Sequence, residues 1–348
     1  MIRPKTAPTS PHISVSRRQA VSGVAALCSL SLVGEAAALT ATPRQRVILD
    51  NDFSGDPDGL FQLAHHLASP SVEIPLVIGS HIHVKDFLDK SRTQADNAVA
   101  RVNEVYDMMK LAQRPKTVAG YNAAPAKDAK PQPTEAARLI IAEAMRTDTK
   151  LPLFYAAGAG LTELAEALKL EPGIGKKMKL VWIGGYEHAD LMPAGIPPRR
   201  DSEYNTTINL AAVQTVFNDS DIEIWQVPRN VYRQLNISYA ELFAGLAPAG
   251  KLGTYLIAQL ERVMAAIKAN LGETYILGDS PLVTLTALQS SFDPDSSSSA
   301  YTIRPTPRVT DNARYEVNPT GRPMRVYLNI DTRMTFADMF AKLAATAK

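Results

Sequence analysis

Short apolar runs alternate with segments of helical periodicity along most of the chain, and this alternation constrains the fold more than any other feature. RVILD (46–50), VEIPLVIGS (72–80) and PLFYAAG (152–158) have the length and apolar content of buried strands. GLFQLAHHLAS (59–69) and TEAARLIIAEAMR (134–146) space their apolar residues as helices do. The alternation predicts βαβ units, so we expect an α/β fold with a mostly parallel central sheet flanked by helices.

The same pattern continues to the end of the chain. Further strands are predicted at KTVAGYN (116–122), KLVWIGG (179–185), IEIWQVP (222–228) and VYLNID (326–331). Further helices are predicted at residues 89–112, 161–170, 209–219 and 334–347, and the long segment 239–271 is predicted to be largely helical. The polar patch FDPDSSSSAYTIRPTPRVTDN (292–312) reads as an exposed excursion rather than as a linker between domains.

The first 41 residues read as an export signal. Arg17 and Arg18 precede an apolar run and then small residues of the A-x-A kind, which is typical of a twin-arginine signal. The run is short for a membrane span, and a short hydrophobic anchor is the alternative interpretation. We therefore expect a signal peptide over 1–41, a single domain over 42–348, and a periplasmic or secreted protein.

Loss of the signal changes the charge balance of the chain. The sequence holds 37 Lys and Arg against 35 Asp and Glu, and 33 basic and 34 acidic residues remain over 42–348. This balance indicates neither nucleic acid nor an anionic membrane as a partner. The single cysteine, Cys28, lies in the signal, so the remaining chain has no thiol for a disulfide or a thiolate metal site.

A cluster of like charges follows the first predicted strand, in VILDNDFSGDPDGL (47–60). Its four aspartates are Asp50, Asp52, Asp56 and Asp58. A divalent cation held by these carboxylates would offset their repulsion. An acidic turn without a ligand is the alternative. An EF-hand loop would need a preceding helix and a glutamate where Phe61 stands.

Other strand ends are expected to lie near this loop. Gly158 ends one apolar run, and Gly184 and Gly185 end another. Because parallel sheets bind ligands beyond the carboxyl ends of their strands, these positions and the aspartate loop are expected to border one crevice.

The aspartate loop resembles the signature of the inosine–uridine nucleoside hydrolases, D-x-D-P-G-x-D-D after the first strand. Later segments resemble that family's motifs in the same order, so that the resemblance extends over about 46–345. These segments are AAGAGLTELAEALKLEP (156–172), VWIGGY (181–186), SEYNTTINLAAVQTVF (202–217) and GDSPLVTLTAL (278–288). The resemblance implies a Rossmann-like open sheet and hydrolysis of N-glycosidic bonds.

The resemblance also implies a calcium ion that binds the ribose 2′- and 3′-hydroxyls and a water. The implied metal ligands are Asp52, Asp56, Asp58, Asp279 and the carbonyl of Gly158. Asp52 is in addition the implied general base toward the water. The implied sugar contacts are Asp58, Glu203 and Asn205, of which Asn205 has the alternative role of a helix cap.

The chemistry agrees with these roles. Cleavage of an N-glycosidic bond develops positive charge on the sugar ring, which a carboxylate-rich pocket stabilises. Calcium can orient two hydroxyls and lower the pKa of a water, and a neighbouring aspartate can take the proton of that water.

Two features depart from the family pattern. The adjacent Asp-Asp pair is replaced by DPDG (56–59), which leaves open whether Asp56 or Asp58 faces the pocket. Gly278 stands where several members carry a histidine that is the proposed acid for the leaving base. His188, Glu273 and Tyr275 are candidate replacements, and each has an alternative role at the surface or in packing.

The loop after the second strand reads GSHIHV (79–84). His81 and His83 either reach the pocket or are solvated. An H-x-H pair can ligate zinc, but no third ligand is evident in the sequence.

We therefore expect calcium-dependent hydrolysis of a ribonucleoside or a related riboside. The alternatives are a non-catalytic periplasmic binder of ribosides or polyols that keeps the metal, and a hydrolase for another glycoside. The expected partner is a small-molecule nucleoside. A homo-oligomer is a further expectation, since members of the family often form dimers or tetramers.

Overall fold

The computed structural model describes residues 41–197, 199–267, 272–289 and 299–347. The chain divides into two units, Met1–Thr40 and Ala41–Lys348, and only the second is described here. The predicted signal peptide over 1–41 therefore lies outside the described residues, apart from Ala41. Within the described ranges, none of the helices has the length and apolar character that crossing a membrane requires.

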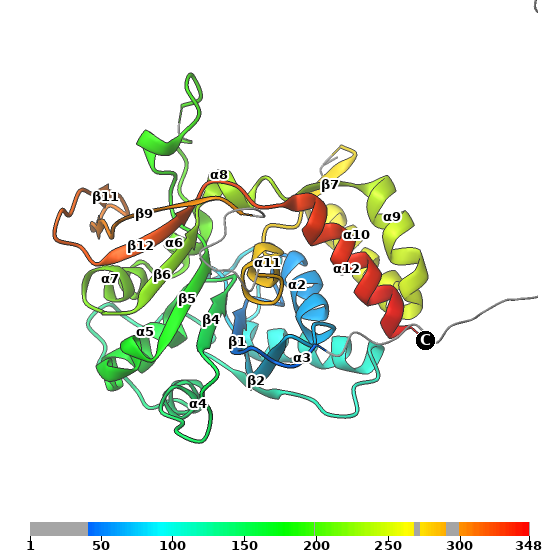
Figure 1. The fold of residues 1–348 in the computed structure, drawn as a ribbon, viewed down its shortest axis with the longest axis horizontal. Helices are drawn as coiled ribbons and strands as arrows, with labels where there is room; N and C mark the ends of the chain where they lie inside the picture. Colours follow the sequence, from blue (N-terminus) through cyan, green and yellow to red (C-terminus); the bar gives the residue numbers. More distant parts are fainter. Residues whose placement is uncertain (1–40, 198, 268–271, 290–298, 348) are drawn as a thin grey trace, which may run out of the picture. The chain divides into compact units, whose positions relative to one another are not determined.

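A central sheet of eight strands runs through the second unit in the order β3-β2-β1-β4-β5-β6-β12-β9 (Figure 1). Neighbouring strands are parallel except β12 and β9, which confirms the predicted mostly parallel sheet. The order reverses between β1 and β4, where doubly wound folds bind their ligands. The strands are β1 (Gln45–Asn51), β2 (Val72–Gly79), β3 (Lys116–Ala119), β4 (Leu153–Ala157), β5 (Met178–Ile183), β6 (Glu223–Val227), β9 (Tyr301–Pro305) and β12 (Pro323–Tyr327).

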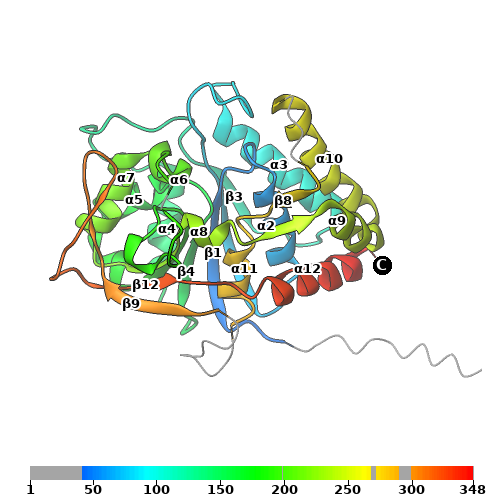
Figure 2. The ribbon, with the colours of Figure 1, turned by 90° about the horizontal axis from the view of Figure 1, so that it is seen from above.

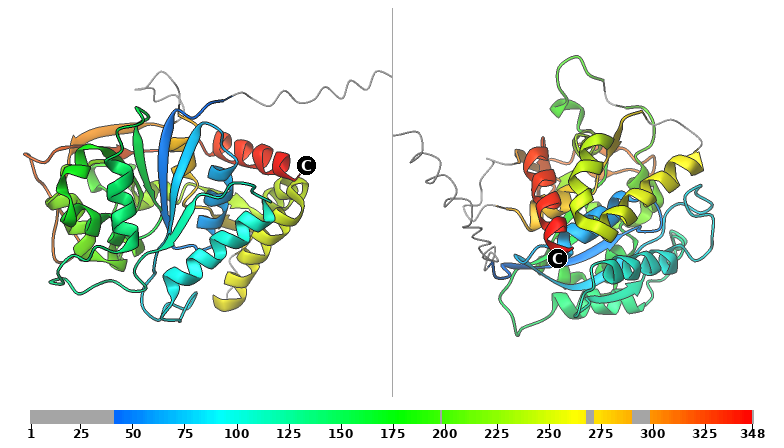
Figure 3. Two further views of the ribbon diagram at one scale, coloured as in Figure 1. Left: turned by 90° about the horizontal axis from the view of Figure 1, so that it is seen from below. Right: turned by 90° about the vertical axis from the view of Figure 1, so that its right-hand side faces the viewer.

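Helices cover both faces of the sheet, because successive strand residues point to opposite sides. In β1, Val47 and Leu49 pack into one hydrophobic core, and Ile48 packs into the other. Figures 2 and 3 show the two helical layers on either side of the strands. The first core includes α2 (Asp58–Leu67), α3 (Gln94–Met108), α9 (Tyr239–Leu246), α10 (Gly250–Ile267), α11 (Pro281–Thr286) and α12 (Thr332–Thr346). The second includes α4 (Glu135–Ala144), α5 (Thr162–Leu170) and α7 (Leu210–Asn218).

Shorter elements complete the described unit. The short helices are α6 (Tyr204–Ile208) and α8 (Arg229–Tyr232), with 3-10 turns η1 (Pro172–Lys176), η2 (Ala189–Leu191) and η3 (Ala247–Ala249). Two antiparallel pairs lie outside the main sheet, β7 (Asn236–Ser238) with β8 (Thr274–Ile276) and β10 (Arg308–Val309) with β11 (Tyr315–Glu316). β8 leads directly to the segment that carries Asp279.

The segment predicted to be largely helical at 239–271 is so in its described part, and one other prediction differs from the structure. Within that segment α9 and α10 are separated where Pro248 lies in a 3-10 turn and Gly250 has a φ of 58°. Such a left-handed residue ends a helix. The polar patch at 292–312 is more than an exposed excursion, because its described part contributes the edge strand β9 and buries Val309 of β10. An edge strand tolerates polar residues because one of its sides has no neighbouring strand.

Candidate active site

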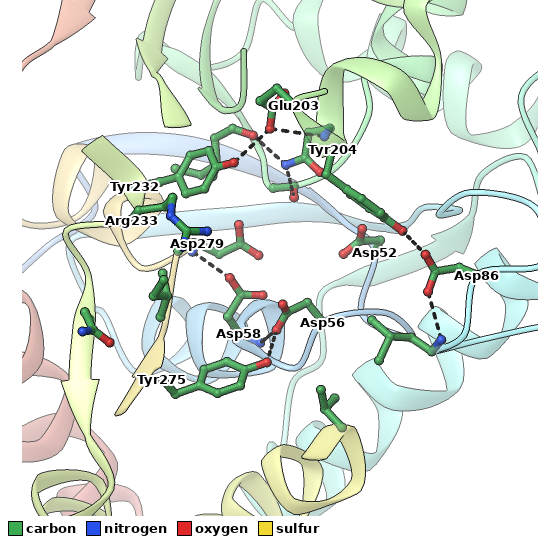
Figure 4. Close-up of a pocket in the computed structure, with 18 of the residues that line it drawn as sticks. Asp52, Asp56, Asp58, Asp86, Glu203, Tyr204, Tyr232, Arg233, Tyr275 and Asp279 are labelled. Atoms are coloured by element: carbon green, nitrogen blue, oxygen red, sulfur yellow. Dashed lines mark hydrogen bonds between the residues drawn. The ribbon is translucent and has the colours of Figure 1, made fainter. Parts of the chain in front are cut away.

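The carboxyl ends of β1 and β4 open onto a pocket of about 710 Å³. Asp52 follows directly on β1, and Asp279 lies just before α11. All seven residues that the sequence indicated as metal or sugar contacts line this one pocket: Asp52, Asp56, Asp58, Gly158, Glu203, Asn205 and Asp279. Figure 4 shows the carboxylates of Asp52, Asp58 and Asp279 directed into the same space.

A buried hydrogen-bond network connects the aspartate loop to the segment that carries Asp279. The Asn51 side-chain amide donates to Asp279 Oδ2 at 2.9 Å and to Gln62 Oε1 at 3.2 Å. The backbone N–H of Asp279 donates to Asp58 Oδ2 at 3.1 Å. Asp58 is also the first residue of α2, where the partial positive charge of the helix N-terminus favours a carboxylate. Two distant parts of the sequence are therefore held in one site.

Among the aspartates of the pocket, the Asp52 carboxylate has the fewest interactions with other side chains. Its residue is 5% exposed, and among the described residues its side chain accepts no hydrogen bond and forms no ion pair. Burial raises the pKa of Asp52 well above its usual range, and repulsion by Asp279 and Asp56 raises it further. A buried anionic group without a partner is costly, so this position favours either a proton or a cation.

The pKa values of Asp58 and Asp279 shift in the same direction. Burial raises the pKa of Asp58, and repulsion by Asp279 and Asp56 adds to the shift. Burial likewise raises the pKa of Asp279 to about 7, although the hydrogen bond from Asn51 opposes the shift. In the described part of the chain, neither carboxylate pairs with a lysine or an arginine. The group as a whole therefore carries excess negative charge.

The chemistry of these donors fits a hard divalent cation, since calcium prefers carboxylate and carbonyl oxygens. Asp52, Asp58 and Asp279 are the residues that could hold such an ion. Within the ranges described, no three His, Cys, Asp or Glu side chains are already close enough together to ligate one ion.

Asp56 and Asp58 occupy different positions in the pocket. Asp58 is 8% exposed and is bonded to Asp279, whereas Asp56 is exposed and accepts a hydrogen bond of 2.7 Å from the Tyr275 hydroxyl. Proline at position 57 lies at the start of α2 and separates the two carboxylates. The DPDG sequence (56–59) thus holds Asp58 against Asp279 and Asp56 against Tyr275.

Asn205 is bonded to the backbone of two strand ends. Its side-chain amide donates to the carbonyls of Gly158 at 3.0 Å and Ile183 at 2.7 Å. Both of its N–H donors are thus used within the protein, and its Oδ1 remains as an acceptor. The Gly158 carbonyl accepts this one hydrogen bond and keeps a second lone pair, as its predicted role as a metal ligand requires.

Glu203 caps the start of α6 and is fully buried. Its Oε2 accepts from the backbone N–H of Gly185 at 2.8 Å and from Thr206, and its Oε1 accepts from the Tyr232 hydroxyl at 3.1 Å. A sugar hydroxyl could bond Glu203 only by replacing one of these donors. The contacts therefore indicate that Glu203 mainly positions its neighbours in the pocket wall.

A buried ion pair anchors the segment that precedes Glu203. Arg229 donates to the two oxygens of Glu187 at 2.6 and 2.7 Å, and both side chains are almost fully buried. The same guanidinium donates to the carbonyls of Asp201 and Ser202. Arg229 thus fixes the backbone from which Glu203 enters the pocket.

We expect Glu187→Gln to lower the free energy of unfolding by about 3 kcal/mol, because it removes the bidentate carboxylate from the buried Arg229 charge and leaves only the Asp201 carboxylate at 3.5 Å. Urea denaturation of both proteins measures the difference. Glu316→Gln, at an exposed position, is the matched control and should change stability by less than about 0.5 kcal/mol. Equal stability of the Glu187 variant and the wild type would contradict this role of the ion pair.

A pH dependence is expected for the ion-free protein. The pKa of Asp279 is raised to about 7 in the folded state, against about 4 in an unfolded chain. The folded state therefore binds this proton more tightly, and the free energy of unfolding should fall as pH rises from about 4 to about 7. Urea midpoints measured in chelator across this range test the expectation. The fall should be smaller in Asp279→Asn, and an equal fall in the two proteins would contradict it.

The histidines named from the sequence do not line the described pocket. His188 is buried against Gln226, to which it is bonded at 2.9 Å. His81 contacts Thr162, and His83 contacts Thr207. Of the three candidate acids, Tyr275 is in the pocket lining, while His188 and Glu273 are not.

Several lining residues were not found from the sequence. Those with polar or charged side chains that interact in or face the pocket include Asp86, Tyr204, Tyr232 and Arg233. The Tyr204 hydroxyl donates a hydrogen bond of 2.7 Å to Asp86, which Figure 4 shows as a dashed line. The EYN segment that drew attention to Glu203 and Asn205 also contains Tyr204, but no pattern in the sequence pointed to the other three.

Comparison with known proteins identifies the class. The chain matches the family described as inosine-uridine preferring nucleoside hydrolase over residues 47–339. The chain therefore belongs to this family. Its members are N-glycosyl hydrolases, which act on nucleosides, and the sequence-based prediction of the family and of the enzyme class is confirmed. No curated protein matches the chain.

Solved structures share the fold at low identity. An inosine-uridine preferring nucleoside hydrolase from Bacillus anthracis is 18% identical, with a TM-score of 0.63 over 87% of this chain and 99% of that one. A purine-preferring ribonucleoside hydrolase from Gardnerella vaginalis is 18% identical, with a TM-score of 0.65 over 87% and 99%. A plant nucleoside hydrolase is 19% identical, with a TM-score of 0.64 over 87% and 100%. These likenesses support the predicted fold class.

Proposed function

We propose that the chain hydrolyses the N-glycosidic bond of ribonucleosides or related ribosides in a calcium-dependent reaction, with Asp52 as the general base. The observation that carries this proposal is the convergence of Asp52, Asp58 and Asp279 in one pocket, with raised pKa values and without a basic partner among the described residues. A family match over residues 47–339 supports the reaction class.

Asp52, Asp58, Asp279 and the Gly158 carbonyl are the proposed oxygen ligands. Bound calcium would orient the ribose 2′- and 3′-hydroxyls and lower the pKa of the attacking water. Asp56, at the rim with Tyr275, is the weakest candidate ligand of the four aspartate positions, because it is exposed and already hydrogen-bonded.

The reaction needs a base for the attacking water and stabilisation of the sugar. Asp52 accepts no hydrogen bond among the described residues, so its carboxylate is free to take the proton of a water. The C1′–N bond breaks as the water oxygen approaches C1′, and positive charge develops on the ring. The surrounding carboxylates stabilise this charge in place. Asn205 Oδ1 can accept a hydrogen bond from a sugar hydroxyl and so help to orient the ring.

Turnover of inosine, uridine and p-nitrophenyl riboside tests the proposal. We expect release of ribose from at least one of them in the presence of calcium, measured by chromatography of the products. Calorimetry with the same compounds separates an enzyme from the alternative riboside binder. Binding without any turnover would contradict the proposed reaction.

We also propose that residues 1–41 direct export to the periplasm or the medium, and that residues 42–348 form the mature enzyme. The twin arginine and the apolar run that follows it support this proposal. Fractionation of cells that express the full chain and a chain with Arg17 and Arg18 changed to lysine would test it. Sedimentation of the purified protein would test the expected homo-oligomer.

A further inference from the structure

The position before Asp279 supplies no acid for the leaving base. Gly278 lines the pocket without a side chain, and a Cβ placed there would lie 3.3 Å from Asp58 Oδ2 and 3.4 Å from Tyr232 Cδ2. No histidine lines the described part of the pocket. The Tyr232 ring thus borders the space that a side chain at position 278 would enter, and the next residue, Arg233, lines the same pocket.

Arg233 is the single basic side chain among the described residues that line the pocket. Six carboxylates share this lining: Asp52, Asp56, Asp58, Asp86, Glu203 and Asp279. Although these carboxylates line the same pocket, the Arg233 guanidinium forms no ion pair and no hydrogen bond with the described residues, and Arg233 is exposed. Figure 4 shows Arg233 between Tyr232 and Asp279 in that view.

Arg229, by contrast, has a structural role in the same segment. Arg229, four residues earlier, is buried and bonded to Glu187 and to backbone carbonyls. Arg233 ends the same short helix as its C-cap, which directs the chain toward β7 and holds the residue at the pocket wall. Its planar array of donors is therefore available to a ligand rather than to the fold.

We propose that Arg233 binds the departing base and stabilises it as an anion, in place of a general acid at position 278. This role rests on the proposed function. As the C1′–N bond breaks, its electron pair moves onto the base and is delocalised over the ring nitrogens and carbonyl oxygens. The Arg233 guanidinium donates hydrogen bonds to these atoms and stabilises the negative charge. The water oxygen bonds to C1′, Asp52 takes the water proton, and the free base is protonated from solvent.

A comparison of leaving groups tests this role. Arg233→Met should lower kcat on inosine on the order of 10²-fold, because it removes a donor that acts on charge formed in the transition state. KM should remain nearly unchanged. Turnover of p-nitrophenyl riboside should also remain nearly unchanged, because nitrophenolate leaves without assistance. Arg233→Lys keeps the positive charge and should lose less activity on inosine than Arg233→Met.

Arg200→Met is the matched control, since Arg200 is exposed, forms no ion pair with the described residues and does not line the pocket. It should leave both activities unchanged. Equal losses on the two substrates, no loss on inosine, or a lysine variant as slow as the methionine variant would each overturn the role of Arg233 while leaving the proposed function intact. Failure of the wild-type chain on both ribosides would instead overturn the proposed function, and this role with it.

Discussion

Asp52→Asn is expected to lower kcat on inosine on the order of 10³-fold, which is typical for loss of a well-placed general base. The amide keeps the shape of the side chain but cannot take a proton from water. Its effect should fall on kcat and kcat/KM together, because the lost interaction belongs to the transition state. Steady-state assays with inosine at neutral pH measure the change.

The folded protein should survive this substitution. Burial and the neighbouring carboxylates already raise the pKa of Asp52, so a neutral amide removes repulsion and should not lower the stability of the ion-free protein. Asp128→Asn, at an exposed position outside the pocket, is the control and should retain full activity. A variant at Asp52 with turnover within about tenfold of the wild type would exclude Asp52 as the base.

Removal of calcium is expected to abolish turnover, and its return should restore it. The carboxylates of Asp52, Asp58 and Asp279 repel one another when no cation offsets their charge. An ion that binds only the folded protein also stabilises it, by about 2.7 kcal/mol at a concentration one hundred times its Kd. Assays and thermal unfolding in chelator, followed by calcium, measure both effects.

Asp279→Asn tests whether the effects of calcium on turnover and on thermal stability come from the same site. It should weaken the rise in melting temperature that calcium produces and lower turnover in the same preparation, whereas Asp128→Asn should change neither. Full activity of a chelated sample that contains no divalent metal by elemental analysis would contradict calcium dependence. Activity that depends on the ion in Asp279→Asn as strongly as in the wild type would exclude Asp279 as a ligand.

The central sheet and the aspartate loop could be predicted because their signals are local. RVILD (46–50) has the length and apolar character of a buried strand, and β1 spans Gln45–Asn51. Because parallel sheets bind ligands beyond the carboxyl ends of their strands, the aspartates that follow this strand could be placed at the expected crevice from the sequence. The resemblance added Asp279 and Glu203, and the structure brings both to the same pocket.

Other parts of the site depend on contacts that no local pattern reveals. Arg233 belongs to no recognisable motif, and its position follows from the short helix α8 and from the buried Arg229 before it. The resemblance implies a sugar contact for Glu203, whereas its hydrogen bonds from Gly185 and Tyr232 follow only from the folded structure. The edge strand β9 was missed because polar residues dominate a strand that has one neighbour.

The hydrogen bond from Asn51 to Asp279 joins residues 228 positions apart. A chain that is terminated before Asp279 keeps the whole aspartate loop but lacks the partner that closes it. Such a truncated product contains the sequences of β1 and α2 but not the complete site. If the proposed ion is bound, its protection of the protein against proteolysis is expected only for chains that the ribosome has completed beyond Asp279.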